Sequence, residues 1–209
     1  YPYYRDGAYT LALGMTPKDH FLAFLGRAAD PNSGGRQMPM HYGQKALRIV
    51  SQSSATGTQY LQSVGCALTR QLENNREIVY VSSGEGTTSQ GDFHEALNWA
   101  SRTKAPLIFH IQDNEYAIST HKSEQTAGSV YSLVSGYENL SRYEVDGTNF
   151  FETHLAFKQA TERARRGKGP SVIISNVVRL LPHSSSDDQR KYRTQEDLEK
   201  DLHRDPILL

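Results

Sequence analysis

Two apolar patterns alternate along the chain, one with helical spacing and one with the continuity of short buried strands. Helical spacing predicts helices over residues 16–29, 57–72, 91–103 and 151–166. Runs rich in β-branched residues predict strands over residues 78–81, 106–111, 143–145 and 171–178. Because strands alternate with helices, we expect an α/β fold with a doubly wound, mostly parallel sheet and helices on both faces. We expect residues 1–209 to form a single domain.

The first predicted helix has clear start signals. Thr16 can cap it, and Pro17 suits the first helical position. We expect its buried stripe to consist of Phe21, Leu22, Phe24 and Leu25. Gly, Pro, Ser and Asn predict irregular structure over residues 31–44, and Ser, Gly and Tyr do so over residues 112–140. The mixed charges of residues 187–205 predict a solvated face or loop, and the Arg163–Lys168 cluster predicts a helix end.

Composition excludes several classes of protein. Lys plus Arg is 23 and Asp plus Glu is 23, so no basic surplus exists for non-specific binding to nucleic acid. Apolar runs reach about six residues, whereas a membrane helix needs about 20. The one cysteine, Cys66, excludes an intrachain disulfide, and we expect it to be a buried small hydrophobe. The first residues lack Met and the features of a signal peptide, so we expect a fragment of a longer chain.

Oxygen-bearing residues follow two of the predicted strands. The first strand end reads S-G-E-G-T-T-S-Q-G-D over residues 83–92, and the second reads Q-D-N-E-Y-A-I-S over residues 112–119. Ligands of a doubly wound sheet bind beyond the carboxyl ends of its strands. Glu85, the amide oxygen of Asn114 and main-chain carbonyls near Tyr116 are donors of the kind that Mg²⁺ prefers beside phosphate. A plain turn followed by a loop is the alternative reading. Gly84, Gly86 and Gly91 do not fit the dinucleotide pattern G-x-G-x-x-G.

The two signals together resemble the thiamine diphosphate signature, in which G-[DE]-G is followed after roughly 25 residues by Asn. The chain is further similar to the α subunit, or α region, of the decarboxylating first component of 2-oxo acid dehydrogenase complexes, and most to the branched-chain type. The segments that carry this resemblance are Y-R-D-G (4–7), G-R-Q-M-P-M-H-Y-G (35–43), S-S-A-T-G-T-Q (53–59), G-E-G-T-T-S-Q-G-D (84–92), N-E-Y-A-I-S-T (114–120) and P-H-S-S-S-D-D (182–188).

The resemblance implies roles for individual residues. It implies Mg²⁺ ligation by Glu85, Asn114 and the main-chain oxygen of Tyr116. The positions that would hold thiamine diphosphate, chiefly its diphosphate, are Tyr4, Arg5, Ser54, Gly86, Thr87, Gln112 and His183. A K⁺ site is implied at Ser53, Ala55, Thr58 and Gln59, although Ala55 stands where a Pro is familiar. Gln112 stands where branched-chain relatives place a phosphate-binding Arg, and Asp113 replaces the first residue of an Asn–Asn pair.

The same resemblance implies an activity and partners. The enzyme would decarboxylate a 2-oxo acid and transfer the acyl group to a lipoyl-bearing acyltransferase, with a Glu of a β subunit activating the cofactor. We therefore expect an α₂β₂ assembly and an inactive isolated chain. The His183 loop would close over the diphosphate, which makes His183 the catalytic candidate of this chain. The compartment would be the cytoplasm in a bacterium or the mitochondrial matrix in a eukaryote.

Two alternatives remain open. The same chemistry could act on pyruvate or acetoin. A non-catalytic interaction subunit with a degraded cofactor site is the other alternative, and the departures at Gln112 and Asp113 favour it. Six other histidines are interpreted as structural or surface residues: His20, His94, His110, His121, His154 and His203.

Overall fold

A parallel four-stranded sheet forms the centre of the protein, in a computed structural model that describes residues 1–208. The strands are β1 (Val79–Gly84), β2 (Leu107–Asp113), β5 (Ser141–Asp146) and β6 (Ser171–Asn176), in the spatial order β1–β2–β6–β5. Every neighbouring pair is parallel, because each strand is followed by a segment that returns to the opposite end of the sheet. The predicted parallel α/β architecture is confirmed.

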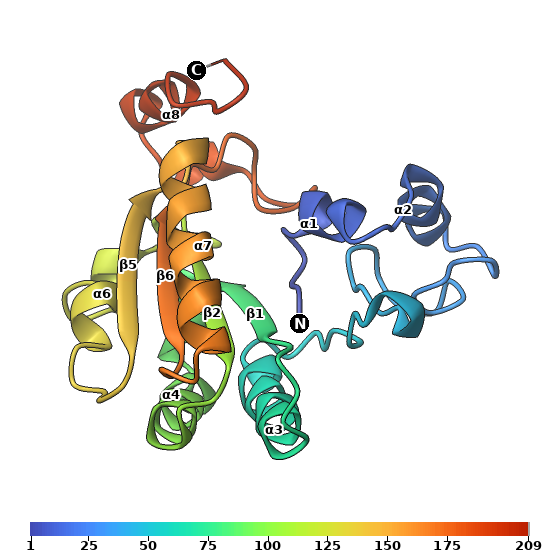
Figure 1. The fold of residues 1–209 in the computed structure, drawn as a ribbon. Helices are drawn as coiled ribbons and strands as arrows, with labels where there is room; N and C mark the ends of the chain where they lie inside the picture. The colour runs from blue at the N-terminus through green and yellow to red at the C-terminus, as the bar shows by residue number, and fades with distance from the viewer. Residues whose placement is uncertain (209) are drawn as a thin grey trace.

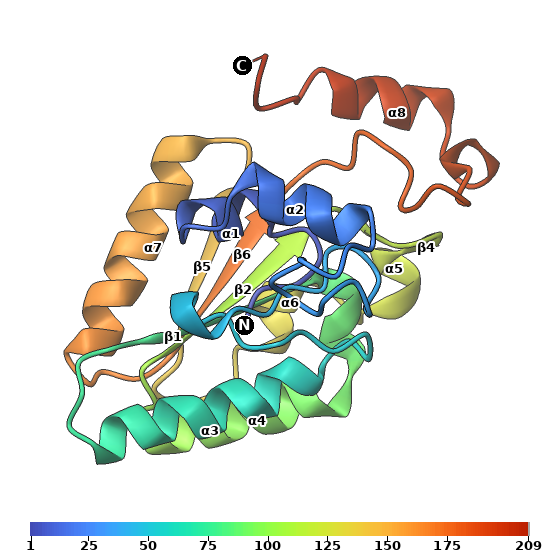
Figure 2. The ribbon, with the colours of Figure 1, turned by 90° about the vertical axis from the view of Figure 1, so that its right-hand side faces the viewer.

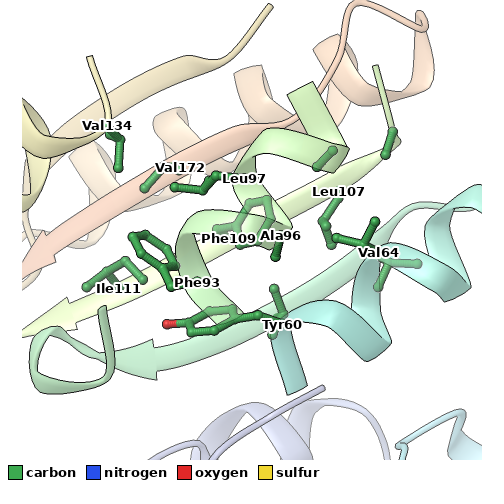
Figure 3. Close-up of a cluster of buried hydrophobic side chains, with 14 of the residues drawn as sticks. Tyr60, Val64, Phe93, Ala96, Leu97, Leu107, Phe109, Ile111, Val134 and Val172 are labelled. Atoms are coloured by element: carbon green, nitrogen blue, oxygen red, sulfur yellow. The ribbon is translucent and has the colours of Figure 1, made fainter. Parts of the chain in front are cut away.

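Helices cover both faces of this sheet (Figures 1 and 2). Helices α3 (Thr58–Leu72) and α4 (Gly91–Thr103) pack together on one face, and α7 (Phe150–Arg165) packs on the other. Alternate residues of β2 point to opposite faces, so Phe109 belongs to the α3–α4 side and Ile108 to the α7 side. Figure 3 shows the larger core, where Phe93 and Leu97 of α4 meet Phe109 and other buried residues. The sheet is therefore fixed rigidly from both sides.

The predicted elements of this central layer are confirmed within a few residues. Asn149 caps α7 by accepting hydrogen bonds from the main-chain N–H groups of Phe151 and Glu152. The same helix ends at Arg165, so the cationic cluster does mark a helix end. Cys66 is half-buried and packs at the edge of the larger core rather than inside it.

The first predicted helix differs from expectation. Thr16 and Asp19 form the capping box of α2 (Pro17–Phe24), but the helix stops early, before Gly26 adopts a φ of +57°. Phe21 and Leu25 are 65% and 62% exposed, so the expected buried stripe is wrong. Helix α2 lies beside the sheet, not on either of its faces, as Figure 1 shows.

Short elements occupy segments for which no regular structure was expected. Residues 1–57 also contain α1 (Gly7–Ala12) and the 3₁₀ helix η1 (Lys45–Leu47). The segment after β2 contains β3 (Tyr116–Ala117), β4 (Thr120–His121), α5 (Lys122–Gln125) and α6 (Val130–Leu133). The C-terminal segment contains η3 (Gln189–Lys191) and α8 (Gln195–Leu202), which buries none of its residues. Over residues 1–208, no helix has the length and apolar character needed to cross a membrane.

Candidate cofactor site

The carboxyl ends of β1 and β2 place the two predicted metal-binding side chains side by side. Glu85 opens the 3₁₀ helix η2 (Glu85–Ser89) directly after β1, and Asn114 follows β2. Gly84 is paired in register with Gln112, so β1 and β2 end at the same level of the sheet. The main-chain N–H of Asn114 donates to Glu85 Oε2 at 3.2 Å, and both side chains are buried. The structure thus brings together what the sequence separates by 29 positions.

Both side chains keep a buried polar atom without a partner among the described residues. Glu85 Oε1 and Asn114 Nδ2 make no hydrogen bond, whereas Asn114 Oδ1 accepts from the N–H of Tyr116 at 3.1 Å. A buried polar atom without a partner costs about 1–3 kcal/mol, and more when it is charged. Burial and the neighbouring Asp113 raise the pKa of Glu85 above its ordinary range. A cation bound at Glu85 Oε1 would satisfy this oxygen and favour the charged carboxylate, whereas Asn114 Nδ2 is a donor and would need an acceptor such as a phosphate oxygen.

The donor set fits a hard cation that takes some of its ligands from this chain and the rest from a cofactor. Over residues 1–208, no group of three or more His, Cys, Asp or Glu side chains could hold a metal alone. Glu85 would therefore act together with amide, main-chain and phosphate oxygens, which is the coordination that Mg²⁺ prefers at phosphate sites.

The carboxylate of Asp113 forms an ion pair within the chain. Its Oδ2 lies 3.3 Å from Nζ of Lys122, and its Oδ1 accepts from the N–H of Glu115 at 2.9 Å. Burial alone would lower the pKa of Lys122, but the carboxylates of Asp113 and Glu115 raise it. Lys122 therefore stays charged, and Asp113 adds less negative charge at the site than its sequence position indicates.

Arg5, Tyr4 and His183 form a second cluster of predicted site residues. Nη1 of Arg5 donates to the main-chain oxygen of Gln112 at 3.2 Å, at the end of β2. The Arg5 guanidinium lies 5.8 Å from the ring centre of Tyr4, whose ring meets His183 edge-on at 5.8 Å. A permanent cation and an imidazole thus both lie near the Tyr4 ring, and Nη1 of Arg5 lies 3.9 Å from where a Cβ on Gly84, the residue before Glu85, would be.

His183 belongs to a loop that is fastened to the segment carrying Tyr116. The main-chain N–H of His183 donates to Oδ2 of Asp187 at 2.8 Å, and the Tyr192 hydroxyl donates to the same oxygen at 2.6 Å. Arg179 donates to the Tyr192 hydroxyl at 2.6 Å and to the main-chain oxygen of Ile118 at 2.7 Å. Burial, followed by the charges of Arg179 and Arg5, lowers the pKa of His183. The imidazole is therefore neutral near pH 7.

Gly86 is required by a close approach of two segments. A Cβ on Gly86 would lie 2.6 Å from Cβ of Ala117 in β3, and Gln125 donates to the main-chain oxygen of Gly86 at 2.6 Å. These contacts hold η2 against the loop that carries Asn114 and Tyr116. Thr87, the next residue, is half-buried at the same end of the sheet.

The predicted K⁺ ligands lie in a compact turn and in the first two residues of α3, which follows it. Thr58 Oγ1 donates to the main-chain oxygen of Ala55 at 3.0 Å, and Ser53 Oγ accepts from the N–H of Ala55 at 3.2 Å. Gln59 anchors this turn, because its Nε2 donates to the main-chain oxygen of Ser82 in β1 at 3.2 Å. The four predicted residues are therefore neighbours, and their binding of K⁺ stays a prediction.

Ser54 has a partner that sequence reasoning did not identify. Its hydroxyl lies 2.7 Å from Nε2 of His41, and Nδ1 of His41 lies 3.2 Å from the main-chain oxygen of Met38. His41 is part of the G-R-Q-M-P-M-H-Y-G segment, yet only the fold reveals that the two loops meet.

Sequence reasoning also missed the three residues that fasten the His183 loop: Asp187, Tyr192 and Arg179. The available signal was a charged Arg179 within the otherwise apolar stretch V-V-R-L-L.

A cavity of about 1410 Å³ lies between the outer edge of β1 and the N-terminal segment. Its lining reaches Arg5, Asp6 and Gln112 but does not include Glu85 or Asn114. His110 lines it as well, with its ring nitrogens 2.9 Å from the Tyr80 hydroxyl and 3.0 Å from the Ser175 hydroxyl. The structural interpretation of His110 is confirmed.

The chain is similar to known proteins over its whole length. The family described as "Dehydrogenase E1 component" matches residues 1–209. The chain is 46% identical to the "2-oxoisovalerate dehydrogenase subunit alpha" of Bacillus subtilis, over 99% of this chain and 63% of that protein. It is 38% identical to the mitochondrial 2-oxoisovalerate dehydrogenase subunit alpha of Mus musculus, over 91% of this chain and 41% of that protein.

A further relative has a different substrate in its name. The "Pyruvate dehydrogenase E1 component subunit alpha" of Staphylococcus epidermidis is 34% identical, over 99% of this chain and 54% of that protein. The chain thus spans less than two thirds of these relatives. A solved structure of benzoylformate decarboxylase from Polynucleobacter necessarius aligns with a TM-score of 0.47 and 20% identity, over 65% of this chain and 28% of that one.

Proposed function

This chain belongs to the dehydrogenase E1 component family, and we propose that it binds the Mg²⁺–diphosphate end of thiamine diphosphate in a branched-chain 2-oxo acid dehydrogenase. The observation that carries the proposal is the buried Glu85 carboxylate, which has an unpartnered oxygen and lies beside Asn114 at the ends of two adjacent strands. The 46% identity to the 2-oxoisovalerate subunit of Bacillus subtilis, against 34% for the pyruvate relative, supports the branched-chain assignment.

The proposed Mg²⁺ ligands are Glu85, Asn114 and the main-chain oxygen of Tyr116. The residues proposed to hold the diphosphate are Tyr4, Arg5, Ser54, Gly86, Thr87 and His183. Arg5 supplies a permanent positive charge, and the neutral His183 imidazole supplies a hydrogen bond without adding charge. Ser53, Ala55, Thr58 and Gln59 would bind K⁺ and stiffen the turn that presents Ser54.

Thiamine diphosphate, when bound, supplies the electron sink that makes loss of CO₂ from a 2-oxo acid possible. This chain orients the cofactor by its charged end. Burial of Glu85 and Asn114 excludes water from the metal ligands, which strengthens each interaction there. The braced loop of His183 contacts Tyr4, and we propose that from there it would cover the diphosphate and guide the lipoyl group.

The proposed assembly has further parts. A β subunit, or a fused β region, would supply the Glu that activates the cofactor, in an α₂β₂ arrangement. A lipoyl-bearing acyltransferase would accept the acyl group. The isolated chain would therefore be inactive, and the compartment would be the cytoplasm of a bacterium or the mitochondrial matrix.

Titration calorimetry with Mg²⁺ and thiamine diphosphate tests the proposal on the chain assembled with its β partner. Glu85→Ala should weaken binding by at least about tenfold, because a buried charged ligand is lost. Glu115→Ala is the matched control, since this nearby carboxylate is exposed and pairs with Lys122. Absence of binding by the unaltered assembly would favour the non-catalytic interaction subunit.

Substrate choice is a separate question, because a pyruvate dehydrogenase relative also matches nearly the whole chain. Steady-state assays of the assembled enzyme should give the highest kcat/KM with 2-oxoisovalerate. A higher value with pyruvate or acetoin would retain the cofactor site and refute only the substrate assignment.

A further inference from the structure

Gln112 lies in a buried network that leads to Arg5. Its Oε1 accepts from the Tyr3 hydroxyl at 3.2 Å, and its Nε2 donates to Oδ1 of Asp6 at 2.7 Å. The Tyr3 hydroxyl in turn accepts from Nη1 of Arg5, which also donates to the main-chain oxygen of Gln112. The Gln112 side chain is thus bonded on both sides within the chain, so its expected binding to the diphosphate would compete with these contacts.

Asp6 anchors this network to the N-terminal main chain and to β1. Its Oδ2 accepts from the main-chain N–H of Tyr3 at 3.1 Å and from the Ser82 hydroxyl of β1. Asp6 and Tyr3 are 4% and 3% exposed, so both are held in place by burial as well as by hydrogen bonds. Loss of a partner here would leave a buried polar group unsatisfied, which makes the arrangement self-reinforcing.

We infer that Gln112 is a positioning residue, which acts through Tyr3 and Asp6 to hold the Arg5 guanidinium over the carboxyl end of β2. This inference rests on the proposed function, since it concerns the cation that would meet the diphosphate. A neutral amide suits the place, because it accepts from Tyr3 and donates to Asp6 at once. An arginine has no acceptor for the Tyr3 hydroxyl, so the charge at this edge comes from Arg5 instead.

The test is a mutant cycle on the affinity of the β-assembled protein for thiamine diphosphate with Mg²⁺. Gln112→Met should weaken binding on the order of tenfold in the unaltered background. In an Arg5→Ala background the same change should have little further effect, because the residue it positions is gone. Equal weakening in both backgrounds would show direct binding of the diphosphate by Gln112 and overturn the inference, as would no weakening in the unaltered protein.

Thr87→Val provides the matched control, since Thr87 is proposed to contact the cofactor directly. Its effect should add to that of Arg5→Ala, because independent contacts contribute additively. Tyr3→Phe is a milder second variant that keeps the ring and removes only the connecting hydroxyl. It should reproduce the weakening seen with Gln112→Met, although Tyr3 itself is buried.

A second readout needs no cofactor and separates the two claims. The losses in free energy of unfolding from Tyr3→Phe and Gln112→Met should be less than additive, since both remove the same hydrogen bond. If the unaltered assembly fails to bind thiamine diphosphate, the proposed function fails, whereas such coupling still upholds the hydrogen bond between Tyr3 and Gln112 on which the positioning of Arg5 rests. Strict additivity in unfolding would overturn the network whether or not the cofactor binds.

Discussion

At the scale of single residues, burial decides which polar groups have a chemical role. Glu85 and His110 are both buried, but Glu85 keeps a side-chain oxygen without a partner among the described residues, whereas both ring nitrogens of His110 have partners. His110 is satisfied by Tyr80 and Ser175, so its imidazole contributes to folding. The same physical cost of burial therefore supports the proposed binding role of Glu85 and a structural role of His110.

His110 predicts a pH dependence of stability. Burial lowers its pKa to about 3 in the folded protein, against an ordinary value of 6.5. The unfolded chain therefore binds a proton at His110 below pH 6.5 that the folded chain does not bind until about pH 3. Its stabilising contribution is present above pH 6.5 and is lost as the pH falls.

Urea unfolding should show this dependence in the variant His110→Gln. Between about pH 6 and pH 4, the free energy of unfolding should fall less steeply, by up to about 1.4 kcal/mol per pH unit. His203→Gln, at an exposed histidine, is the control and should leave the slope unchanged. An unaltered slope for His110→Gln would contradict the burial of a neutral imidazole.

At the scale of elements, the site depends on two contacts between short segments. The helix η2 packs on β3 through Gly86 and Ala117, and the His183 loop is fastened through Tyr192 and Arg179. Neither contact belongs to the hydrophobic core of the sheet. Both can therefore be altered with little effect on the central layer.

Gly86→Ala should disturb the site by a steric clash. The new Cβ would lie 2.6 Å from Cβ of Ala117, so one segment must shift. We expect a loss of about 1–3 kcal/mol in stability, typical of overpacking, together with weaker cofactor binding. The second change Ala117→Gly should restore most of both losses. Calorimetric melting and cofactor titration measure them, and a double variant no better than Gly86→Ala would exclude this clash as the cause.

Tyr192→Phe should loosen the His183 loop. The change removes the hydroxyl that joins Arg179 to Asp187, whose Oδ2 also holds the main-chain N–H of His183. Limited proteolysis should cut residues 183–193 several times faster than in the unaltered protein, because local opening costs less. Tyr131→Phe, on α6, is the control. Equal cleavage rates would show that the loop is held by other contacts.

At the scale of the whole molecule, the apolar residues divide between a core and an exposed margin. Phe109 of β2 is fully buried against Tyr60 of α3 and Phe93 of α4, whereas Phe21 of α2 is 65% exposed. A buried aromatic ring stabilises the fold through its removal from water, and an exposed one does not. The stability of the chain thus resides in the sheet and its covering helices.

Thermal unfolding of two variants tests this division. Phe109→Ala should cost about 3–5 kcal/mol, because a large buried side chain is removed. Phe21→Ala should change the stability of the chain by less than about 0.5 kcal/mol, as exposed substitutions do. A large loss from Phe21→Ala would show that α2 packs against other residues of this chain in solution.

The sequence by itself determined the strand–helix order, because hydrophobic periodicity reports burial directly. It also predicted that Glu85 and Asn114 lie close together, since each follows a strong strand signal and strand ends meet at one edge of a parallel sheet. It misjudged Phe21 and Leu25, because periodicity shows that a helix has an apolar face but not whether anything covers it. Only the tertiary structure decided the partners of Gln112 and His183, since those hydrogen bonds join residues whose proximity depends on how whole segments pack.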